Sequence, residues 1–265
     1  MIRRFALALA ACLAVAGPAG WQRARAGPTE VDLALVIAVD VSLSMDLEEQ
    51  ALQRQGFIEA FQAPAVHAAI RGGMLGRIAV TYVEWAGAGN QTVVMPWTLI
   101  EGEAEARGFA ETLSRRPPRR ATWTSISSAL DFSANLFAEG GFEAARRVID
   151  VSGDGPNNQG RLVTEARDAV LAKGIVVNGL PIMLKEPTGA WDYPNLDQYY
   201  RDCVIGGPGA FMVPVRDKEQ FVTAVRTKIL REVADLPSEP LLTRVQEAPR
   251  TDCRMGERRI GRDWN

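Results

Sequence analysis

A run of apolar residues over 31–39, interrupted only by Asp32, is the strongest pattern in the chain. Such a run, ended by polar residues, is typical of a strand buried on both faces of a sheet. Further strands are predicted at 77–85, 91–99, 147–151, 175–180 and 211–215. Apolar positions at helical spacing predict helices at 47–71, 103–113, 124–138, 161–173 and 218–233. Pro64 is expected to kink or end the first of these helices.

Strands that alternate with helices predict an α/β fold, with a doubly wound, mostly parallel sheet and helices on both faces. The link at 86–90 is short and rich in glycine, so the second and third strands should form an antiparallel hairpin at one edge. We expect one domain over 31–235, with an irregular stretch at 183–209. The composition of residues 236–265 predicts a C-terminal tail and not a second domain.

Residues 1–26 have the layout of a secretory signal peptide. Arg3 and Arg4 precede an apolar core, and Ala24-Arg25-Ala26 resembles a cleavage site. This core is too short to span a bilayer, so no transmembrane segment is expected. Leu9-Ala10-Ala11-Cys12 resembles a lipoprotein cleavage box, but the apolar run continues past Cys12, which favours an ordinary signal. The sequence therefore predicts an exported protein, periplasmic or secreted.

Charge and cysteine content narrow the possible partners and the compartment. The formal charge is −2, and it becomes −6 without residues 1–26, because that segment holds four arginines and no acids. An acidic chain gives no electrostatic basis for binding nucleic acid. Cys203 and Cys253 would remain, and in an oxidising compartment we expect them to form one disulfide, worth about 4 kcal/mol. The alternative is a pair of buried thiols.

Polar side chains gather where three predicted elements begin or end. Asp40, Ser42 and Ser44 follow the first strand at a spacing of two, so their side chains can point the same way. Asp154 follows another strand, and Thr122 or Thr124 can cap the helix that comes next or face the same crevice. Ligands in such sheets collect at the carboxyl ends of the strands, so we expect these groups to converge. Hard oxygen donors of this kind suit Mg²⁺, Mn²⁺ or Ca²⁺.

The combination resembles a von Willebrand factor type A domain with a metal-ion-dependent adhesion site. Asp-x-Ser-x-Ser-Met at 40–45, threonine before a helix, and Asp-Gly at 154–155 carry the resemblance, which covers about residues 31–235. It is similar in particular to a bacterial, exported family of type A-like proteins with no assigned function. Such domains commonly have Gly-Gly where this chain has Arg120-Ala121, and often threonine where it has Gly153. Neither departure removes a ligand.

The resemblance implies a role for each residue of the site. Ser42 and Ser44 would ligate the metal directly, and Thr122 would do so directly or through water. Asp40 and Asp154 would hold coordinated waters. An acidic side chain of a protein or peptide partner would fill the open position.

Several other residues have two interpretations. Asp150 and Glu84 lie in predicted buried strands. A role as a structural anchor is favoured there over a role in which the carboxylate holds the metal ligands in place without touching the metal. Thr124 is the alternative to Thr122 as ligand, or such a support. His67 is the only histidine, and its place near the end of a helix favours a structural role.

Four aromatic residues lie in the stretch 187–203, which leaves the same edge of the sheet as the metal site. Amphipathic aromatics near a site are typical of protein interfaces. Equally, the stretch can form a lid tied down by the Cys203–Cys253 disulfide. The four candidates for a partner surface are Trp191, Tyr193, Tyr199 and Tyr200.

These patterns predict an exported, divalent-metal-dependent binding protein and not an enzyme. One alternative is a metal-assisted hydrolase that uses Asp40 and Asp154, although the sequence offers no evident base or nucleophile beside them. The other is a structural envelope protein with a vestigial metal site.

Overall fold

The computed structural model describes residues 27–185, 193–234 and 251–258. Its centre is a five-stranded sheet in the order β3-β2-β1-β4-β5, with β3 antiparallel to β2 and the other neighbours parallel. The strands are β1 (Thr29–Asp40), β2 (Ile78–Trp85), β3 (Gln91–Ile100), β4 (Phe142–Gly153) and β5 (Val176–Pro181). The helices are α1 (Leu47–Gln62), α2 (Pro64–Arg71), α3 (Glu103–Ser114), α4 (Ile126–Glu139), α5 (Val163–Ala172), α6 (Leu196–Tyr199), the π-helical turn η1 (Tyr200–Val204) and α7 (Phe221–Ala234). The predicted fold class and the antiparallel edge strand are confirmed.

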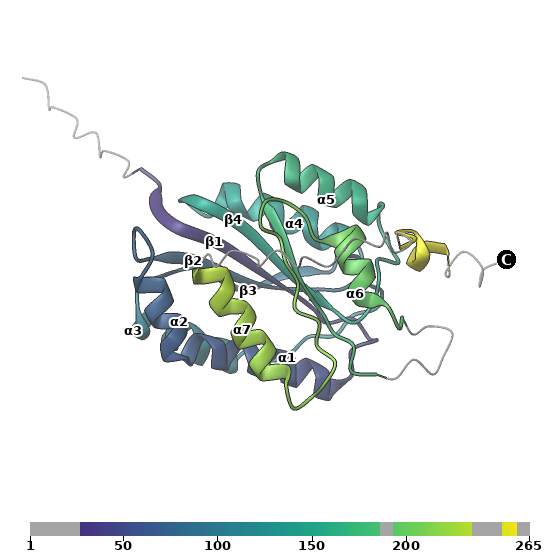
Figure 1. Ribbon diagram of the computed structural model, residues 1–265, viewed down its shortest axis with the longest axis horizontal. Coiled ribbons are helices and arrows are strands. Elements are labelled where there is room, and N and C mark those ends of the chain that lie inside the picture. Colours follow the sequence, from purple (N-terminus) through teal and green to yellow (C-terminus); the bar gives the residue numbers. More distant parts are fainter. Residues whose placement is uncertain (1–26, 186–192, 235–250, 259–265) are drawn as a thin grey trace, which may run out of the picture.

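Strand β1 lies in the middle of the sheet, and its side chains divide between two cores. Leu35 and Ile37 pack in the core under α1, α2, α3 and α7. Val36 and Ala38 pack in the opposite core, under α4, α5 and α6. Figure 1 shows α1, α2 and α7 on one side of the sheet and α4 and α5 on the other. Because both faces of β1 are covered, its sequence is continuously apolar and does not alternate.

The first predicted helix is two helices. The helical backbone is interrupted at Ala63, which is extended at φ −74° and ψ 126°. Proline disfavours helical backbone at the residue before it, so Pro64 ends α1 and begins α2. His67 lies just beyond the break, buried, with its Nε2 2.7 Å from the carbonyl oxygen of Phe61. Its role is structural, as the sequence indicated.

The stretches after β5 differ from their predictions in two ways. Residues 211–215 do not form a full strand, but they extend the sheet through isolated parallel bridges, Gly179↔Met212 and Ile182↔Val215. Pro214 has no N–H to donate and fits such an edge. The predicted irregular stretch contains α6 and η1, which are too short to produce a helical pattern in the sequence.

The expected Cys203–Cys253 disulfide is present, with the two Cα atoms 5.6 Å apart. It holds residues 251–258 against the domain, where Asn157 Nδ2 donates to Glu257 Oε1 at 2.8 Å. The predicted signal peptide and residues 236–250 and 259–265 of the predicted tail lie outside the described residues. Among the described helices, none combines the length and the apolar character needed to cross a membrane.

Helix α7 is held to the sheet by close packing and by a buried ion cluster. At Gly56 in α1, an added Cβ would lie 2.8 Å from Val225 Cγ2, so the two helices approach without room for a side chain. Lys228 Nζ lies 2.7 Å from both Asp150 Oδ1 and Glu232 Oε1, and none of the three side chains is more than 1% exposed. Burial lowers the pKa of Lys228, but the two carboxylates outweigh it and the pKa is raised. Asp150 is therefore a structural anchor.

Replacing Lys228 should unfold the domain more easily. In Lys228→Met, Asp150 and Glu232 would face each other in the core without a cation. A buried pair broken on one side typically costs about 3–5 kcal/mol, and we expect a loss of that order in the free energy of unfolding. Urea denaturation measures it, with Lys218→Met as a control because Lys218 pairs with Glu48 on the surface. A loss below about 1 kcal/mol in Lys228→Met would contradict the anchoring role.

Candidate metal centre

The loops that follow β1 and β4 bring four of the predicted site residues together. The two strands are parallel neighbours, with Val39 opposite Ser152, so both leave the sheet at the same edge. The Ser42 N–H donates to Asp40 Oδ1 at 2.7 Å, and the Oγ atoms of Ser42 and Ser44 lie 2.8 Å apart. Ser44 Oγ donates to Asp154 Oδ1 at 2.6 Å. We call Asp40, Ser42, Ser44 and Asp154 the oxygen cluster.

Asp40 is the most constrained group of the cluster. It is fully buried, and its Oδ2 has no hydrogen-bond partner within the described structure. Burial, together with the nearby charge of Asp154, raises the pKa of Asp40 well above its usual range, although hydrogen bonds from Ser42 act the other way. Burial also raises the pKa of Asp154, against the opposing effects of Ser44 and Lys185. A buried carboxylate oxygen without a partner is an unusual feature that a cation or an ordered water would satisfy.

Gly153 and Tyr200 shape the pocket around Asp40. An added Cβ at Gly153 would lie 2.8 Å from Asp40 Oδ2 and 3.1 Å from the Tyr200 hydroxyl, so the glycine makes room for both. Tyr200 is fully buried, and burial and the charge of Asp40 raise its pKa well above the usual value. Placing it against the cluster depends on the π-helical turn η1, for which the sequence gives no signal.

Thr122 lies beside the cluster, and Thr124 does not. Ala121 forms an isolated parallel β-bridge with Ser42, and the N–H of Ala121 donates to the carbonyl of Val41 at 3.1 Å. This pairing places the exposed Thr122 next to the Ser42 loop. Thr124 is buried, and its N–H donates to Asn158 Oδ1 at 2.8 Å. The sequence predicted that Thr122 or Thr124 caps the helix that follows, and this is wrong. The cap of α4 is Ser125, whose side chain accepts from the N–H of Ser128. Thr122 as a metal ligand stays a prediction.

Two groups that the sequence did not single out also border the cluster. Glu49 is buried at the start of α1, where it and Asp46 form a capping box with reciprocal 2.8 Å hydrogen bonds. Lys185 Nζ lies 2.6 Å from Glu49 Oε2 and 3.5 Å from Asp154 Oδ2. Of these features, only the capping box could have been predicted from the sequence, through the spacing of Asp46 and Glu49.

Of the proposed supporting residues, Glu84 and Asp150 belong to other ion pairs. Glu84 pairs with Arg54, and burial raises its pKa while Arg54 acts to lower it. Asp150 pairs with Lys228. No hydrogen bond in the described parts of the chain joins either carboxylate to the oxygen cluster, so the structural interpretation applies to both.

The proposed aromatic partner surface is wrong for two of its four residues. Tyr199 and Tyr200 are fully buried, because α6 and η1 turn them into the core instead of toward solvent. Tyr193 is partly buried and packs against the same core. Trp191 lies outside the described residues.

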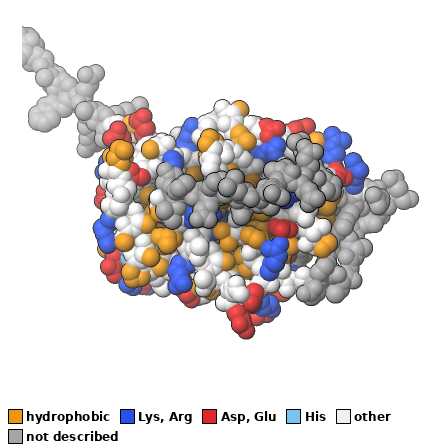
Figure 2. Space-filling model, viewed as in Figure 1, with side chains coloured by type: hydrophobic (Ala, Val, Ile, Leu, Met, Phe, Trp, Pro, Cys, Tyr) orange, Lys and Arg blue, Asp and Glu red, His pale blue; other side chains and the backbone are white. Residues whose placement is uncertain are grey.

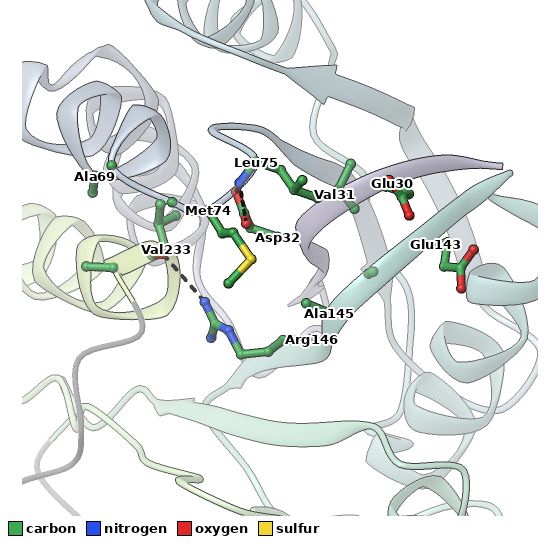
Figure 3. Close-up of a pocket in the computed structure, with 14 residues that line it drawn as sticks. Glu30, Val31, Asp32, Ala69, Met74, Leu75, Glu143, Ala145, Arg146 and Val233 are labelled. Carbon is green, nitrogen blue, oxygen red and sulfur yellow. Dashed lines mark hydrogen bonds between the residues drawn. The ribbon is translucent and has the colours of Figure 1, made fainter.

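A hollow lies at the end of the sheet opposite the oxygen cluster. It has a volume of about 710 Å³ and is bordered by the first residues of β1 and β4, the end of α2 and the end of α7. Figure 3 shows Met74 projecting into it, with Asp32 bound to the backbone of Leu75. Asp32 accepts a hydrogen bond from the N–H of Leu75, and Arg146 donates to the carbonyl of Glu232, so both charged side chains have backbone partners here.

The chemistry of the oxygen cluster fits a hard cation. Within the described residues, no group of three or more His, Cys, Asp or Glu side chains is placed to hold a metal, so an ion here would depend on the hydroxyls of Ser42 and Ser44 as well as on the two carboxylates. Two carboxylates and two hydroxyls within hydrogen-bond reach, with one carboxylate oxygen unsatisfied, are a donor set suited to a small divalent ion.

Figure 2 shows acidic and basic side chains interspersed over one face, without the broad basic patch typical of nucleic-acid binding.

The family model described as a protein of unknown function, DUF1194, matches residues 30–237. The chain belongs to this family. A comparison with curated protein sequences finds no match to this DUF1194 chain.

Several solved structures share the fold of this DUF1194 protein. Proximal thread matrix protein 1 from the mussel byssus, with a zinc-occupied metal-ion-dependent adhesion site, has a TM-score of 0.58 at 14% identity, covering 79% of this chain and 50% of that one. The pilus adhesin SpaC from Lactobacillus rhamnosus GG has a TM-score of 0.58 at 10% identity, covering 79% and 32%. A von Willebrand factor type A protein from Catenulispora acidiphila has a TM-score of 0.54 at 15% identity, covering 77% and 43%. The chain thus spans half or less of each, and these identities show the type A fold alone.

Asp40→Asn tests the electrostatic cost of the cluster. Because the pKa of Asp40 is higher in the folded chain than in the unfolded one, its ionisation opposes folding. That cost is absent well below the unfolded pKa and grows as the pH rises through it. In EDTA, the gain in stability of Asp40→Asn over the wild type should be smaller near pH 4 than at pH 8, where it should reach about 1 kcal/mol or more. Urea unfolding at both pH values measures this, and an equal difference at both would contradict it.

Proposed function

We propose that this protein is an exported binding domain that uses a divalent ion, Mg²⁺ or Mn²⁺ before Ca²⁺, to hold a carboxylate of a protein partner. Ser42, Ser44 and Thr122 would ligate the ion, and Asp40 and Asp154 would hold its waters. When bound, the ion would supply a Lewis-acid position for an acidic side chain. The type A fold and the zinc-occupied site of the mussel protein support metal binding at a coarse level.

One observation carries this proposal. The fully buried carboxylates of the described chain are Asp40, Glu49, Glu84, Asp150 and Glu232. Each of the other four has a lysine or arginine within ion-pair distance, and Asp40 has none within the described residues. A buried charge needs a counter-charge or several hydrogen bonds. A cation bound at the oxygen cluster would supply the counter-charge that Asp40 lacks.

The surroundings of the cluster favour binding over catalysis. Exposed apolar side chains lie in the two loops beside it, with Leu43 53% and Trp123 41% exposed. Trp123 has a left-handed backbone, φ 69°, an uncommon conformation for a bulky residue that is found more often at functional sites. Arg120 donates to the carbonyl of Met45 at 2.8 Å and so adds positive charge to the same rim. We infer a partner segment that presents an acidic residue with an apolar neighbour.

The hydrolase alternative has less support. The single histidine, His67, is buried and bound to a backbone carbonyl. Within the described structure, no imidazole, thiol or third carboxylate makes a hydrogen bond to the oxygen cluster that would make it a general base. Measurable phosphoester hydrolysis lost in Asp154→Ala would reverse this preference.

Metal binding is tested by calorimetric titration of Mg²⁺ and Mn²⁺. We expect heat in the wild type and none in Asp154→Ala, because Asp154 closes the cluster from the β4 side. At metal concentrations about 100 times the Kd, the wild type should gain about 2–3 kcal/mol in unfolding free energy, and Asp154→Ala should gain nothing. Asp131→Ala, which removes an exposed carboxylate paired with Arg161, is the control and should behave as wild type. Equal heats in wild type and Asp154→Ala would refute the site.

Partner binding is tested by capture from an envelope extract with and without EDTA. Capture should require both metal and Asp154. Trp123→Ala should weaken it about tenfold or more while leaving the metal titration unchanged, because Trp123 lies on the rim and outside the ligand set. Met74→Ala is the matched control, since Met74 is 96% exposed at the other end of the sheet. Capture that survives EDTA unchanged would favour the structural alternative.

A further inference from the structure

Lys185 brings a positive charge into direct contact with the oxygen cluster. Its Nζ lies 3.5 Å from Asp154 Oδ2 and 2.6 Å from Glu49 Oε2, and it donates to the carbonyl of Ser44. The side chains of Glu49 and Asp154 are 1% and 7% exposed, whereas that of Lys185 is 43% exposed. The lysine thus reaches from the surface into a nearly closed acidic site.

The backbone that carries Lys185 is fixed beside the site. The N–H of Ile182 donates to the carbonyl of Gly153 at 2.9 Å, and that of Met183 donates to Val215 at 2.7 Å. Gly153 directly precedes Asp154, so the lysine starts from a strand extension anchored next to its own partner. Glu49 is equally fixed, because its carboxylate also accepts from the N–H of Asp46 in the capping box. The contact is therefore built from two rigid elements and a flexible side chain.

The lysine and a divalent ion at this edge would share one carboxylate, that of Asp154. Asp40, Asp154 and Glu49 contribute three negative charges when ionised, and Lys185 offsets one of them. A divalent ion held through Ser44 and Asp154 would draw on the same carboxylate that faces the ammonium. The two cations would repel each other at short range in a poorly hydrated site, where such interactions are strong.

We propose that Lys185 is a tethered competitor of the metal: its ammonium shares Asp154 with the divalent ion and lowers the affinity of the oxygen cluster for it. This inference rests on the proposed metal-binding function. A side chain of the protein itself, that of Lys185, would then set how tightly the ion is held. Within the described residues, the hydrogen bonds of Arg120 go to the backbone carbonyls of Leu43 and Met45, so it faces no ligand carboxylate as Lys185 does.

The chain offers a matched control in Lys218. Its Nζ lies 2.6 Å from Glu48 Oε2, the same distance as between Lys185 and Glu49, and its side chain is 46% exposed. Glu48 is 64% exposed and contacts no member of the oxygen cluster among the described residues. Replacing either lysine removes one surface-reaching charge near the start of α1. Replacing Lys185 alone removes a charge that faces Asp154.

Titration with Mn²⁺, followed by calorimetry and by the electron paramagnetic resonance of free Mn²⁺, tests the proposal. Lys185→Gln should bind Mn²⁺ about tenfold more tightly than wild type. Lys185→Arg, which keeps the charge, should stay near wild type, and Lys218→Gln should change the affinity by less than about twofold. In EDTA, Lys185→Gln should melt below wild type, because Glu49 and Asp154 lose their cation. The difference should shrink or reverse with Mn²⁺.

The outcomes separate this inference from the proposed function. If wild type binds Mn²⁺ and Lys185→Gln binds it equally or more weakly, the competition is refuted and the metal site stands. If Lys218→Gln tightens binding as much as Lys185→Gln, the effect is general surface charge and the proposal is also refuted. If neither wild type nor Lys185→Gln binds Mn²⁺, both the inference and the metal function fall.

Discussion

The parallel pairing of β1 with β4 is the constraint on which the rest of the structure depends. It sets Val39 opposite Ser152 and therefore sends Asp40 and Asp154 out of the sheet side by side. A slip of one residue would turn every side chain of β1 to the opposite face, exchanging the two cores and moving Asp40 away from its neighbour. Because β1 is covered on both faces, that slip would carry a large packing penalty, so the same burial that stabilises the fold also fixes the geometry of the site.

All but one of the buried carboxylates in the described chain lie within ion-pair distance of a lysine or arginine. Arg54 forms an ion pair with Glu84, Lys228 with Asp150 and Glu232, and Lys185 with Glu49 and Asp154. These cations come from α1, from α7 and from the extension of β5, which are the elements packed around the sheet edge. The ion pairs therefore tie the surrounding helices to the sheet at defined points. Asp40 is the exception among the described residues, because it is buried at the carboxyl end of β1 without a lysine or arginine in ion-pair distance.

Local patterns in the sequence were enough to predict the sheet and most of the oxygen cluster. The apolar run over β1 and the spacing of Asp40, Ser42 and Ser44 are properties of neighbouring residues, and parallel topology then brings Asp154 to the same edge. Side-chain contacts between distant segments could not be predicted in this way. Lys185 reaches the cluster only because the strand extension pairs with Gly153, and Tyr199 and Tyr200 are buried only because of two short helical turns. Aromatic composition alone therefore predicted a surface where the chain builds part of its core.

The Cys203–Cys253 disulfide links the oxygen cluster to the redox state of its surroundings. Cys203 lies in η1, the same turn that holds Tyr200, and the Tyr200 hydroxyl and Asp40 Oδ2 both face Gly153. The bridge joins residues that are 50 positions apart in the sequence, so it restricts the unfolded chain more than a short crosslink would. Reduction would free residues 251–258 and loosen the turn beside Asp40. A reducing environment would thus weaken one wall of the cluster without changing any of its oxygen atoms.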